Sequence, residues 1–318
     1  MASVAKVIIG TRGSSLALWQ ANWIADRLRA AHPGLDVRLA IIKTQGDRIV
    51  RTALPDIGGK GLFTKEIEDA LRAGKVDFAV HSLKDLPTDV PEGLNIAAFA
   101  TREDPRDALV TAQGLALADL AEGASVGTSS PRRQAQLRAA RPDLRFVDLR
   151  GNVETRIRKM REQGLAATVL AMAGLNRLGI AGVGIQPLDP EVCLPAVGQG
   201  ILAVETRDGD GRVSGLVAVL DDGDARACAI AERTVLSGLG GGCQVPMGAL
   251  AEVGENGKLR LRAAVASRDG ARIIRVEMHG NADAAQELGE TAARALLDQG
   301  AGEALLSCGA SPDSLGSA

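Results

Sequence analysis

The chain has 318 residues, of which 46% are hydrophobic and 24% charged, and its formal net charge is −2. This length and composition predict a globular protein of two or three domains. The balanced charge and the 2% aromatic content argue against a nucleic-acid-binding protein or a membrane-surface protein.

The sequence shows no signal peptide and no apolar run long enough to span a bilayer. Its four cysteines form no CxxC pair and are not matched by paired histidines, so we expect no metal site. Reduced thiols and the absence of a leader predict a cytoplasmic protein.

The first residues predict alternating strands and helices. Val4–Ile9 is an apolar run that predicts a buried strand, and Gly10–Ser14 is the loop after it. Apolar residues at helical spacing predict a helix over Leu16–Leu28, and alternation predicts a strand over Val37–Ile41. Strand, helix and strand joined by short links favour a parallel α/β sheet.

Two further loops lead to a strand that ends in polar residues. Lys43–Asp47 and Gly58–Gly61 are predicted loops, and the second opens a helix that stops at Gly74. Val76–Val80 predicts a buried strand, which delivers His81-Ser-Leu-Lys-Asp85 at its carboxyl end. Ligands of open α/β sheets bind at that end of the strands.

Two segments look like crossings between lobes. The polar run Thr101–Asp107 predicts the first crossing, and Pro195–Gly200 predicts the second. Ile201–Glu205 then reads as a strand that returns to the first lobe. Two crossings would place a cleft between the lobes.

The second lobe is predicted to begin with a strand at Ser125–Thr128 and a helix that starts within Ser129–Arg133. Such a helix start directs free N–H groups toward an anion. Phe146–Arg150 and Ala167–Ala171 predict further strands, with a basic helix over Val153–Arg161 between them. Residues 127–161 hold ten Lys and Arg against three Asp and Glu. This excess indicates either an anion-binding edge or a solvated basic face.

The last hundred residues predict a third unit. A helix from Asp222 leads to three strands near Ala249–Val253, Leu259–Ser267 and Arg272–His279, joined by hairpin turns. One final helix is predicted over residues 282–306.

Between the first helix and the first strand of this unit, Gly238–Gly248 holds Cys243 directly after three glycines. Glycines leave room for a bulky group beside the sulfur, and a thiolate is a nucleophile. Cys243 is therefore a candidate covalent attachment site, and an idle thiol is the alternative.

Seven motifs in this order make the chain similar to the porphobilinogen deaminase (hydroxymethylbilane synthase) family over nearly its whole length. They are Thr11-Arg12 before Ser14, Gly58-Gly-Lys-Gly-Leu-Phe63, Val80-His-Ser-Leu-Lys-Asp85, Gly127-Thr-Ser-Ser130 with Arg132-Arg133, Leu149-Arg-Gly-Asn152, Leu194-Pro-Ala-Val-Gly-Gln-Gly200 and Gly241-Gly-Cys-Gln-Val-Pro246. Asp56 departs from the Lys that members often carry, and Gly13 and Pro131 replace bulkier residues. These departures concern loop behaviour and not the class of reaction.

The resemblance implies two α/β lobes like those of periplasmic binding proteins, with a central cleft, and a C-terminal α+β domain with a three-stranded antiparallel sheet. The implied boundaries are 1–100 with 200–220 for the first lobe, 101–199 for the second and 221–318 for the C-terminal domain. It further implies that four porphobilinogen molecules are condensed, with loss of ammonia, onto a dipyrromethane cofactor linked to Cys243, and that hydrolysis then releases hydroxymethylbilane. Independently of the resemblance, the sequence shows no exposed apolar stripe and a balanced charge, so we expect a monomer that acts without nucleic acid or membrane.

The resemblance also assigns roles to individual residues. Asp85 is the expected catalytic carboxylate, which stabilises the cations formed when ammonia leaves and accepts pyrrole N–H bonds. Guanidinium groups suit the carboxylates of the growing chain. Besides Cys243, the expected cofactor-binding residues are Arg12, Ser14, Ser82, Lys84, Thr128, Ser129, Ser130, Arg132, Arg133, Arg150, Arg156 and Gln199. The expected substrate-binding residues are Arg12, Lys60, Arg150, Arg156 and Arg177. His81 is expected to support the site without acting as its general base.

Two other classes of protein are weighed against this reading. A two-lobed solute-binding protein would have the same two lobes. It would, however, be exported, and it would not require a third domain that carries a cysteine. A nucleic-acid-binding or ligand-sensing regulator would need a helix-turn-helix or stacking aromatics, and the sequence shows neither.

Overall fold

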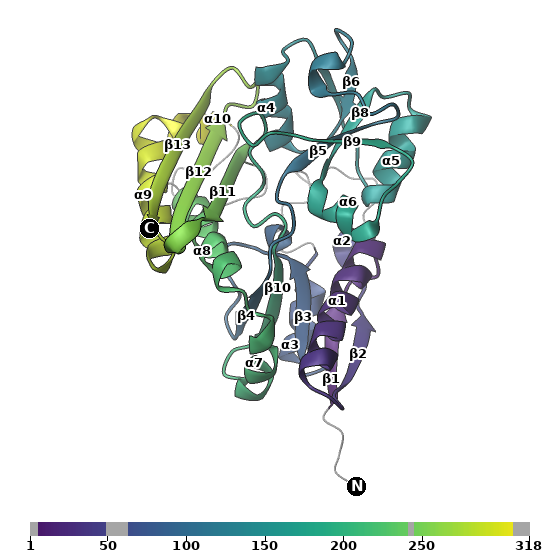
Figure 1. The fold of residues 1–318 in the computed structure, drawn as a ribbon, viewed down its shortest axis with the longest axis vertical. Coiled ribbons are helices and arrows are strands. Elements are labelled where there is room, and N and C mark those ends of the chain that lie inside the picture. The colour runs from purple at the N-terminus through teal and green to yellow at the C-terminus, as the bar shows by residue number, and fades with distance from the viewer. Residues whose placement is uncertain (1–5, 49–62, 241–244, 308–318) are drawn as a thin grey trace. The chain divides into compact units, whose positions relative to one another are not determined.

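The computed structural model describes residues 6–48, 63–240 and 245–307 (Figure 1). The chain divides into two compact units. Unit 1 comprises Met1–Glu103 and Ile201–Arg226, and unit 2 comprises Asp104–Gly200 and Ala227–Ala318. In the described residues, no helix combines the length and the apolar character that a bilayer span requires.

Unit 1 is built on a five-stranded sheet with the order β2-β1-β3-β10-β4. Its strands are β1 (Lys6–Thr11), β2 (Asp36–Ile41), β3 (Phe78–Ser82), β4 (Leu94–Ala100) and β10 (Leu202–Arg207). β1 pairs in parallel with β2 and β3, whereas β10 is antiparallel to β3 and β4. The predicted return strand is therefore confirmed, but the expectation of a parallel sheet is wrong for β10. A chain that re-enters from the other lobe can run in the opposite direction, because no helical crossover constrains it.

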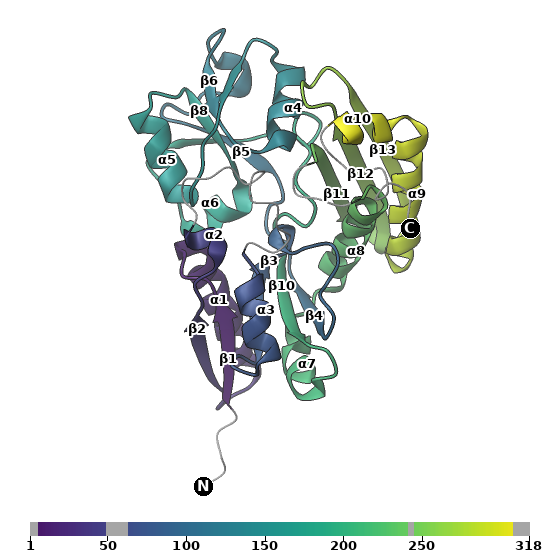
Figure 2. The same ribbon diagram turned by 180° about the vertical axis from the view of Figure 1, so that it is seen from behind.

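Helices cover both faces of this sheet, which Figure 1 and Figure 2 show from opposite sides. α1 (Ser15–Ala31) and α7 (Gly211–Val217) pack on one face, where Ile24 and Val213 belong to a core cluster with Phe78. α3 (Lys65–Arg72) packs on the other face. Burial on both faces explains why β3 reads as an apolar run.

Unit 2 contains a second five-stranded sheet with the order β7-β6-β8-β5-β9. Its strands are β5 (Asp107–Thr111), β6 (Ser125–Gly127), β7 (Arg145–Val147), β8 (Ala167–Ala171) and β9 (Gly184–Pro187). α4 (Pro131–Ala140) contributes Leu137 to the core on one face of this sheet. α5 (Val153–Glu162) and α6 (Met172–Leu178) pack on the other face.

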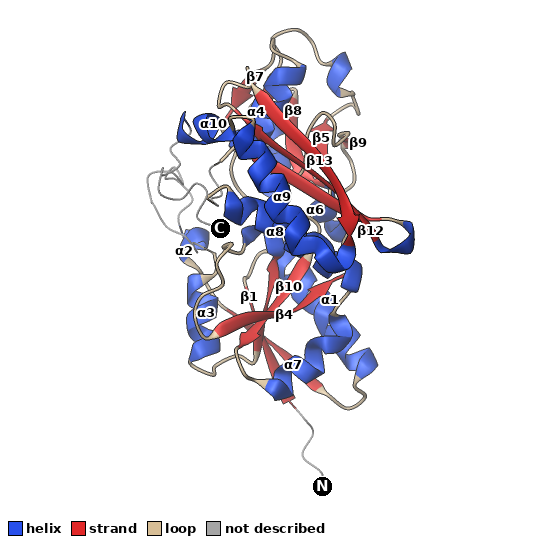
Figure 3. Cartoon of the chain, turned by 90° about the vertical axis from the view of Figure 1, so that its left-hand side faces the viewer, coloured by secondary structure: helices blue, strands red, loops and turns tan. Residues whose placement is uncertain are grey.

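The same unit holds the predicted three-stranded antiparallel sheet, formed by β11 (Met247–Val253), β12 (Lys258–Ala266) and β13 (Ile273–Asn281). α8 (Gly223–Gly238) precedes this sheet in the chain, and α9 (Ala285–Asp298) lies against β12 and β13 (Figure 3). The sheet confirms the expected C-terminal α+β architecture. The three-domain boundaries stay a prediction.

Several expectations about single elements are corrected. The final helix is two helices, α9 and α10 (Ala301–Ser307), because Gly300 takes a φ of +88° and ends the first. α2 (Gln45–Arg48) forms where a loop was expected. The strand expected at Val76–Val80 is displaced to β3, so His81 and Ser82 lie within the strand. β5, β9, α6 and α7 were not predicted, and each has seven or fewer residues.

Candidate active site

Two neighbouring strands of unit 1 carry polar residues to the same edge of the sheet. β1 and β3 are parallel, with Gly10 opposite Ala79, so the residues that follow them emerge together. They line one small cavity of about 60 Å³. The lining residues are Arg12, Ser14, Leu16, Ala17, Gln20, Phe63, Thr64, Val80, His81, Ser82 and Asp85. Four predicted site residues, Arg12, Ser14, Ser82 and Asp85, are thus brought together.

The two serines of this cavity are fixed by local hydrogen bonds. Ser14 is the N-cap of α1, and its Oγ accepts a bond from the Ala17 N–H at 3.3 Å. Ser82 Oγ accepts a bond from Gln20 Nε2 at 2.9 Å, which leaves its own hydroxyl proton available as a donor.

Asp85 ends the short 3₁₀ turn Leu83–Asp85 that follows β3. Its side chain is exposed and lines the cavity. Among the residues that the structure describes, none donates a hydrogen bond to this carboxylate. Asp85 therefore presents all its acceptor positions to a ligand. Lys84 is half-buried and does not line the cavity.

Arg12 is held firmly within the same cavity. Its Nε and Nη2 donate to Asp47 Oδ1 at 3.1 and 2.6 Å, and its guanidinium lies 4.2 Å from the centre of the Phe63 ring. Partial burial raises the pKa of Asp47, but bonds from Arg12 and Thr44 outweigh it and lower the pKa below its ordinary value. No acceptor for Arg12 Nη1 occurs in the described part of the chain.

His81 points one ring nitrogen at a buried carboxylate. Its Nε2 lies 3.1 Å from Glu205 Oε2, and both side chains are almost fully buried. β3 and β10 place the two residues on adjacent strands of the sheet. This pair fixes the ring of His81 beside the cavity.

In unit 2, the residues between β6 and α4 form a compact polar turn. Thr128 Oγ1 accepts a bond from the Ser130 N–H at 3.3 Å, and Ser129 Oγ accepts one from the Leu149 N–H at 3.0 Å. Ser130 is the N-cap of α4 and accepts a bond from the Arg133 N–H. All three predicted hydroxyls therefore have a part in shaping this helix start.

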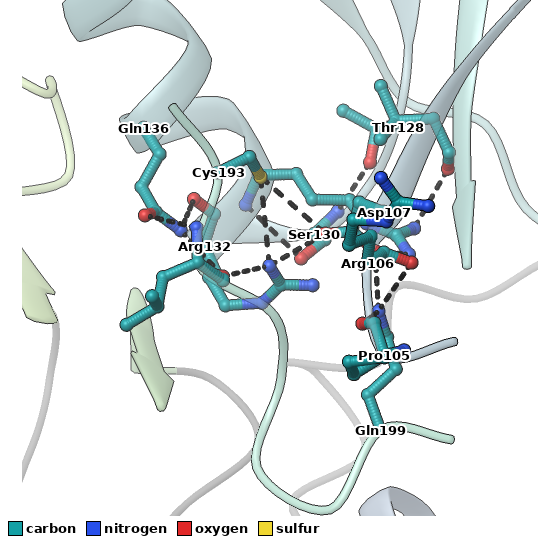
Figure 4. Close-up of polar contacts among 12 residues, drawn as sticks. Pro105, Arg106, Asp107, Thr128, Ser130, Arg132, Gln136, Cys193 and Gln199 are labelled. Carbon is teal, nitrogen blue, oxygen red and sulfur yellow. Dashed lines mark hydrogen bonds and ion pairs between the residues drawn. The ribbon is translucent and has the colours of Figure 1, made fainter. Parts of the chain in front are cut away.

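Arg132 and Arg133, in the first turn of α4, both bind Asp107, the first residue of β5. Figure 4 shows Arg132 beside Asp107. Arg132 Nη1 donates to Asp107 Oδ2 at 2.7 Å, and Arg133 Nη2 donates to Oδ1 at 2.7 Å. Burial raises the pKa of Asp107, but the two guanidinium groups outweigh it and hold the pKa of this carboxyl well below its usual range. Asp107 is thus a buried anion between two buried cations.

Other polar groups complete this network (Figure 4). Gln199 Nε2 donates to Asp107 Oδ1 at 2.9 Å and to the Pro105 carbonyl at 2.8 Å. Asp107 therefore ties together both segments expected to cross between the lobes. The thiol of Cys193 lies 3.5 Å from Asp107, and burial raises its pKa to about 12.

The donors of the two arginines are not all used. The bonds of Arg132 to Asp107, Cys193 and the Leu194 carbonyl all leave from Nη1. Its Nε and Nη2 have no acceptor among the described residues. Arg133 Nε is buried and likewise has no partner there.

Three predicted arginines lie elsewhere in unit 2. Arg156 Nε donates to the Gly151 carbonyl at 2.8 Å, and the buried Arg177 donates to the Gly200 carbonyl at 2.7 Å. Arg150 is half-buried, at the start of the turn before α5. Cys243, Lys60 and Asp56 lie outside the described residues.

Three carboxylates that bind predicted site residues were not themselves predicted from the sequence. They are Asp47, Asp107 and Glu205. Asp107 was assigned to the polar crossing, although the apolar run Ala108–Val110 directly after it was a signal for a buried strand. Asp47 and Glu205 follow no recognisable motif. Their partners are distant in the chain, so only the fold reveals them.

Comparison with known proteins identifies relatives of this chain. Residues 7–215 match the family model described as porphobilinogen deaminase, dipyromethane cofactor binding domain, and residues 226–298 match the porphobilinogen deaminase C-terminal domain. The porphobilinogen deaminase of Pelotomaculum thermopropionicum is 51% identical over 94% of this chain and 96% of its own length. Those of Roseiflexus sp. and Roseiflexus castenholzii are 53% and 54% identical, also over 94% of this chain and over 98% and 97% of theirs.

Proposed function

Because the chain belongs to the porphobilinogen deaminase family, we propose that it is a hydroxymethylbilane synthase that condenses four porphobilinogen molecules head to tail. Ammonia leaves at each condensation, and hydrolysis releases the product. The chain is a transferase of tetrapyrrole biosynthesis, and its larger family domain is one that binds a dipyrromethane cofactor. The structural observation that carries the proposal is the Asp85 carboxylate, unpaired among the described residues, in a cavity that also contains Arg12.

The described residues fit a dipyrromethane, which has pyrrole N–H donors and carboxylates. The cavity of unit 1 offers a carboxylate acceptor at Asp85, and the hydroxyl of Ser82 and the Nη1 edge of Arg12 are available as donors. The Nε and Nη2 donors of Arg132 form a second edge of the kind that binds carboxylates bidentately. When bound, the dipyrromethane supplies the nucleophilic pyrrole carbon from which the chain of rings starts.

Asp85 is the residue to which we assign catalysis. Departure of ammonia from porphobilinogen breaks the C–N bond and leaves a cationic methylene-pyrrole. A fixed carboxylate stabilises this cation and accepts the pyrrole N–H bond, and the ring proton is lost after the new C–C bond forms. A charge that is already in place lowers the activation barrier most, because no group has to rearrange during the reaction.

The basic residues are proposed to bind carboxylates, of which each porphobilinogen unit brings two. Arg132, Arg133 and Arg150 would hold the acids of the cofactor, together with the polar residues Ser14, Ser82, Lys84, Thr128, Ser129, Ser130 and Gln199. The residues proposed to meet the incoming unit and the distal chain are Arg12, Lys60, Arg156 and Arg177. Arg132 supports this assignment, since Asp107 fixes one end of its guanidinium and leaves the other edge to a ligand.

Cys243 is proposed as the covalent attachment site of the cofactor. Cys193 and Cys228 are both buried and form no disulfide in the described residues, and the raised pKa of Cys193 makes its thiol a poor nucleophile. Free cysteines also agree with a reducing compartment, so we place the enzyme in the cytoplasm, acting as a monomer on a small-molecule substrate without nucleic acid or membrane. The solute-binding alternative is not favoured, because the family match includes the C-terminal domain.

An assay of the purified protein with porphobilinogen as the only substrate tests this function. The expected result is release of four ammonia molecules for each hydroxymethylbilane, detected as uroporphyrin after cyclisation and oxidation. Consumption of no porphobilinogen by correctly folded protein would contradict the proposal. Reversible binding of a pyrrole without ammonia release would instead support the solute-binding alternative.

A further inference from the structure

We propose that Asp47 is a positioning residue that prevents Arg12 from pairing with Asp85, so that the cavity of unit 1 keeps both charges available to ligand. This inference rests on the proposed function, because it concerns the carboxylate to which catalysis is assigned. Asp47 belongs to α2, which no motif of the sequence singled out.

Asp47 binds both Arg12 and Thr44. Its Oδ1 accepts bonds from Arg12 Nε and Nη2 at 3.1 and 2.6 Å. Its Oδ2 accepts a longer bond from Arg12 Nε at 3.4 Å, together with bonds from Thr44 Oγ1 at 2.8 Å and from the Thr44 N–H at 3.2 Å. Thr44 is fully buried, so this carboxylate is anchored to the interior of the unit.

The ring of Phe63 holds the guanidinium from a second direction. Arg12 Cζ lies 4.2 Å from the ring centre, a distance at which a cation is attracted to the π face. Phe63 in turn packs tightly on Gly46, where an added Cβ would lie 2.1 Å from the ring. Gly46 and Asp47 are adjacent, so α2 supplies both the partner and the support of the ring.

The cavity explains why Arg12 needs to be restrained. Arg12 and Asp85 line the same cavity. A guanidinium that is not held in place within this cavity would form a strong bidentate pair with the Asp85 carboxylate. That pair would use the acceptor positions that the pyrrole N–H groups require. In the described residues Asp85 has no donor and Arg12 Nη1 has no acceptor, as the proposal requires.

The test combines crystal structures with kinetics of Asp47→Ala, Asp47→Asn and Gly46→Ala. In Asp47→Ala, the guanidinium of Arg12 is expected within 4 Å of the Asp85 carboxylate, with kcat lowered on the order of 10-fold or more. Asp47→Asn keeps one oxygen acceptor for Arg12, so its kcat should fall by less than that of Asp47→Ala. Gly46→Ala keeps Asp47 but displaces Phe63, so its kcat should also fall.

Arg12→Ala provides the decisive background. If Asp47 acts only through Arg12, adding Asp47→Ala to Arg12→Ala should change kcat by less than about twofold, whereas independent effects would multiply. The matched control is Asp143→Ala. The Arg141–Asp143 pair has side-chain exposures of 21% and 25%, against 24% and 27% for Arg12–Asp47, and does not line the cavity. Its loss should leave kcat and KM within about twofold of the parent.

Two results would overturn the inference while the parent enzyme remains active. One is an Asp47→Ala structure in which Arg12 keeps its place or turns to solvent. The other is a kcat loss of the same size with and without Arg12. An inactive parent enzyme would instead count against the proposed function itself, so the two failures are distinguishable.

Discussion

Nη1 of Arg132 lies 2.7 Å from Oδ2 of Asp107, and both side chains are buried. Burial of these two charges costs desolvation free energy. The hydrogen bonds that Arg133 and Gln199 donate to the same carboxylate help to offset that cost. Asp107 thereby fixes the start of α4, where several of the predicted cofactor-binding residues lie.

The first prediction concerns the stability of this network. Asp107→Asn removes the negative charge and leaves two buried guanidinium cations uncompensated, which should lower the free energy of unfolding by about 3–5 kcal/mol. Denaturant unfolding measures the change. Asp104→Asn is the control, because the side chain of its partner Arg106 is 43% exposed and ion pairs that reach solvent contribute about 0–1 kcal/mol. An equal decrease in the free energy of unfolding in both variants would contradict this prediction, because the buried network would then contribute no more than a partly exposed ion pair.

The second prediction concerns pH. The pKa of Asp107 in the folded protein is held well below its usual range, whereas in the unfolded chain it is about 3.9. Its ionised form therefore stabilises the fold above about pH 4, and this contribution is lost as the pH falls toward the folded-state pKa. Thermal unfolding of the parent and of Asp107→Asn between pH 7 and pH 3 tests this. Their difference in stability should be constant above about pH 5 and shrink below pH 4; a difference that grows on acidification would contradict the sign.

The third prediction concerns Asp85. Asp85→Asn should fold normally and lose turnover on the order of 100-fold or more, because an amide cannot balance a cation. Asp89→Asn, four residues further on, is an exposed control that does not line the cavity. Steady-state turnover of both variants, compared with that of the parent, tests this prediction. Turnover of Asp85→Asn within about threefold of the parent would remove Asp85 from catalysis.

The fourth prediction separates His81 from the catalytic role. His81 Nε2 is engaged by buried Glu205, so His81→Asn should slow turnover by less than about 10-fold while lowering the melting temperature. A general base typically contributes on the order of 100-fold or more. A loss of that size with an unchanged melting temperature would instead identify His81 as a base.

Sequence patterns predicted part of the candidate site. The apolar run before His81 predicted a strand with His81–Asp85 at its carboxyl end, because alternation and apolar runs are local properties of the chain. The family resemblance, and not periodicity, added Arg12 and Ser14. The parallel pairing of β1 with β3, which brings Arg12, Ser14, Ser82 and Asp85 to one edge, is known only from the structure.

Long-range pairing could not be predicted in the same way. Asp107 meets Arg132 and Arg133 across separations of 25 and 26 residues, and Asp47 meets Arg12 across 35. The basic stretch between 127 and 161 suggested arginines that face an anionic ligand. The same composition also suits arginines buried against an internal carboxylate, and only the tertiary structure distinguishes the two. β5 was missed for this reason, since its first residue is a charged side chain that the fold neutralises.

The measurement that tests the central claim most directly is the intact mass of freshly purified protein, compared with that of Cys243→Ser. The parent should exceed the mass of the bare chain by one dipyrromethane, and Cys243→Ser should match the bare chain. Cys193→Ser and Cys228→Ser should keep the added mass, because these two thiols are buried. A parent protein with the mass of the bare chain and full turnover, or an adduct that persists in Cys243→Ser, would contradict the account.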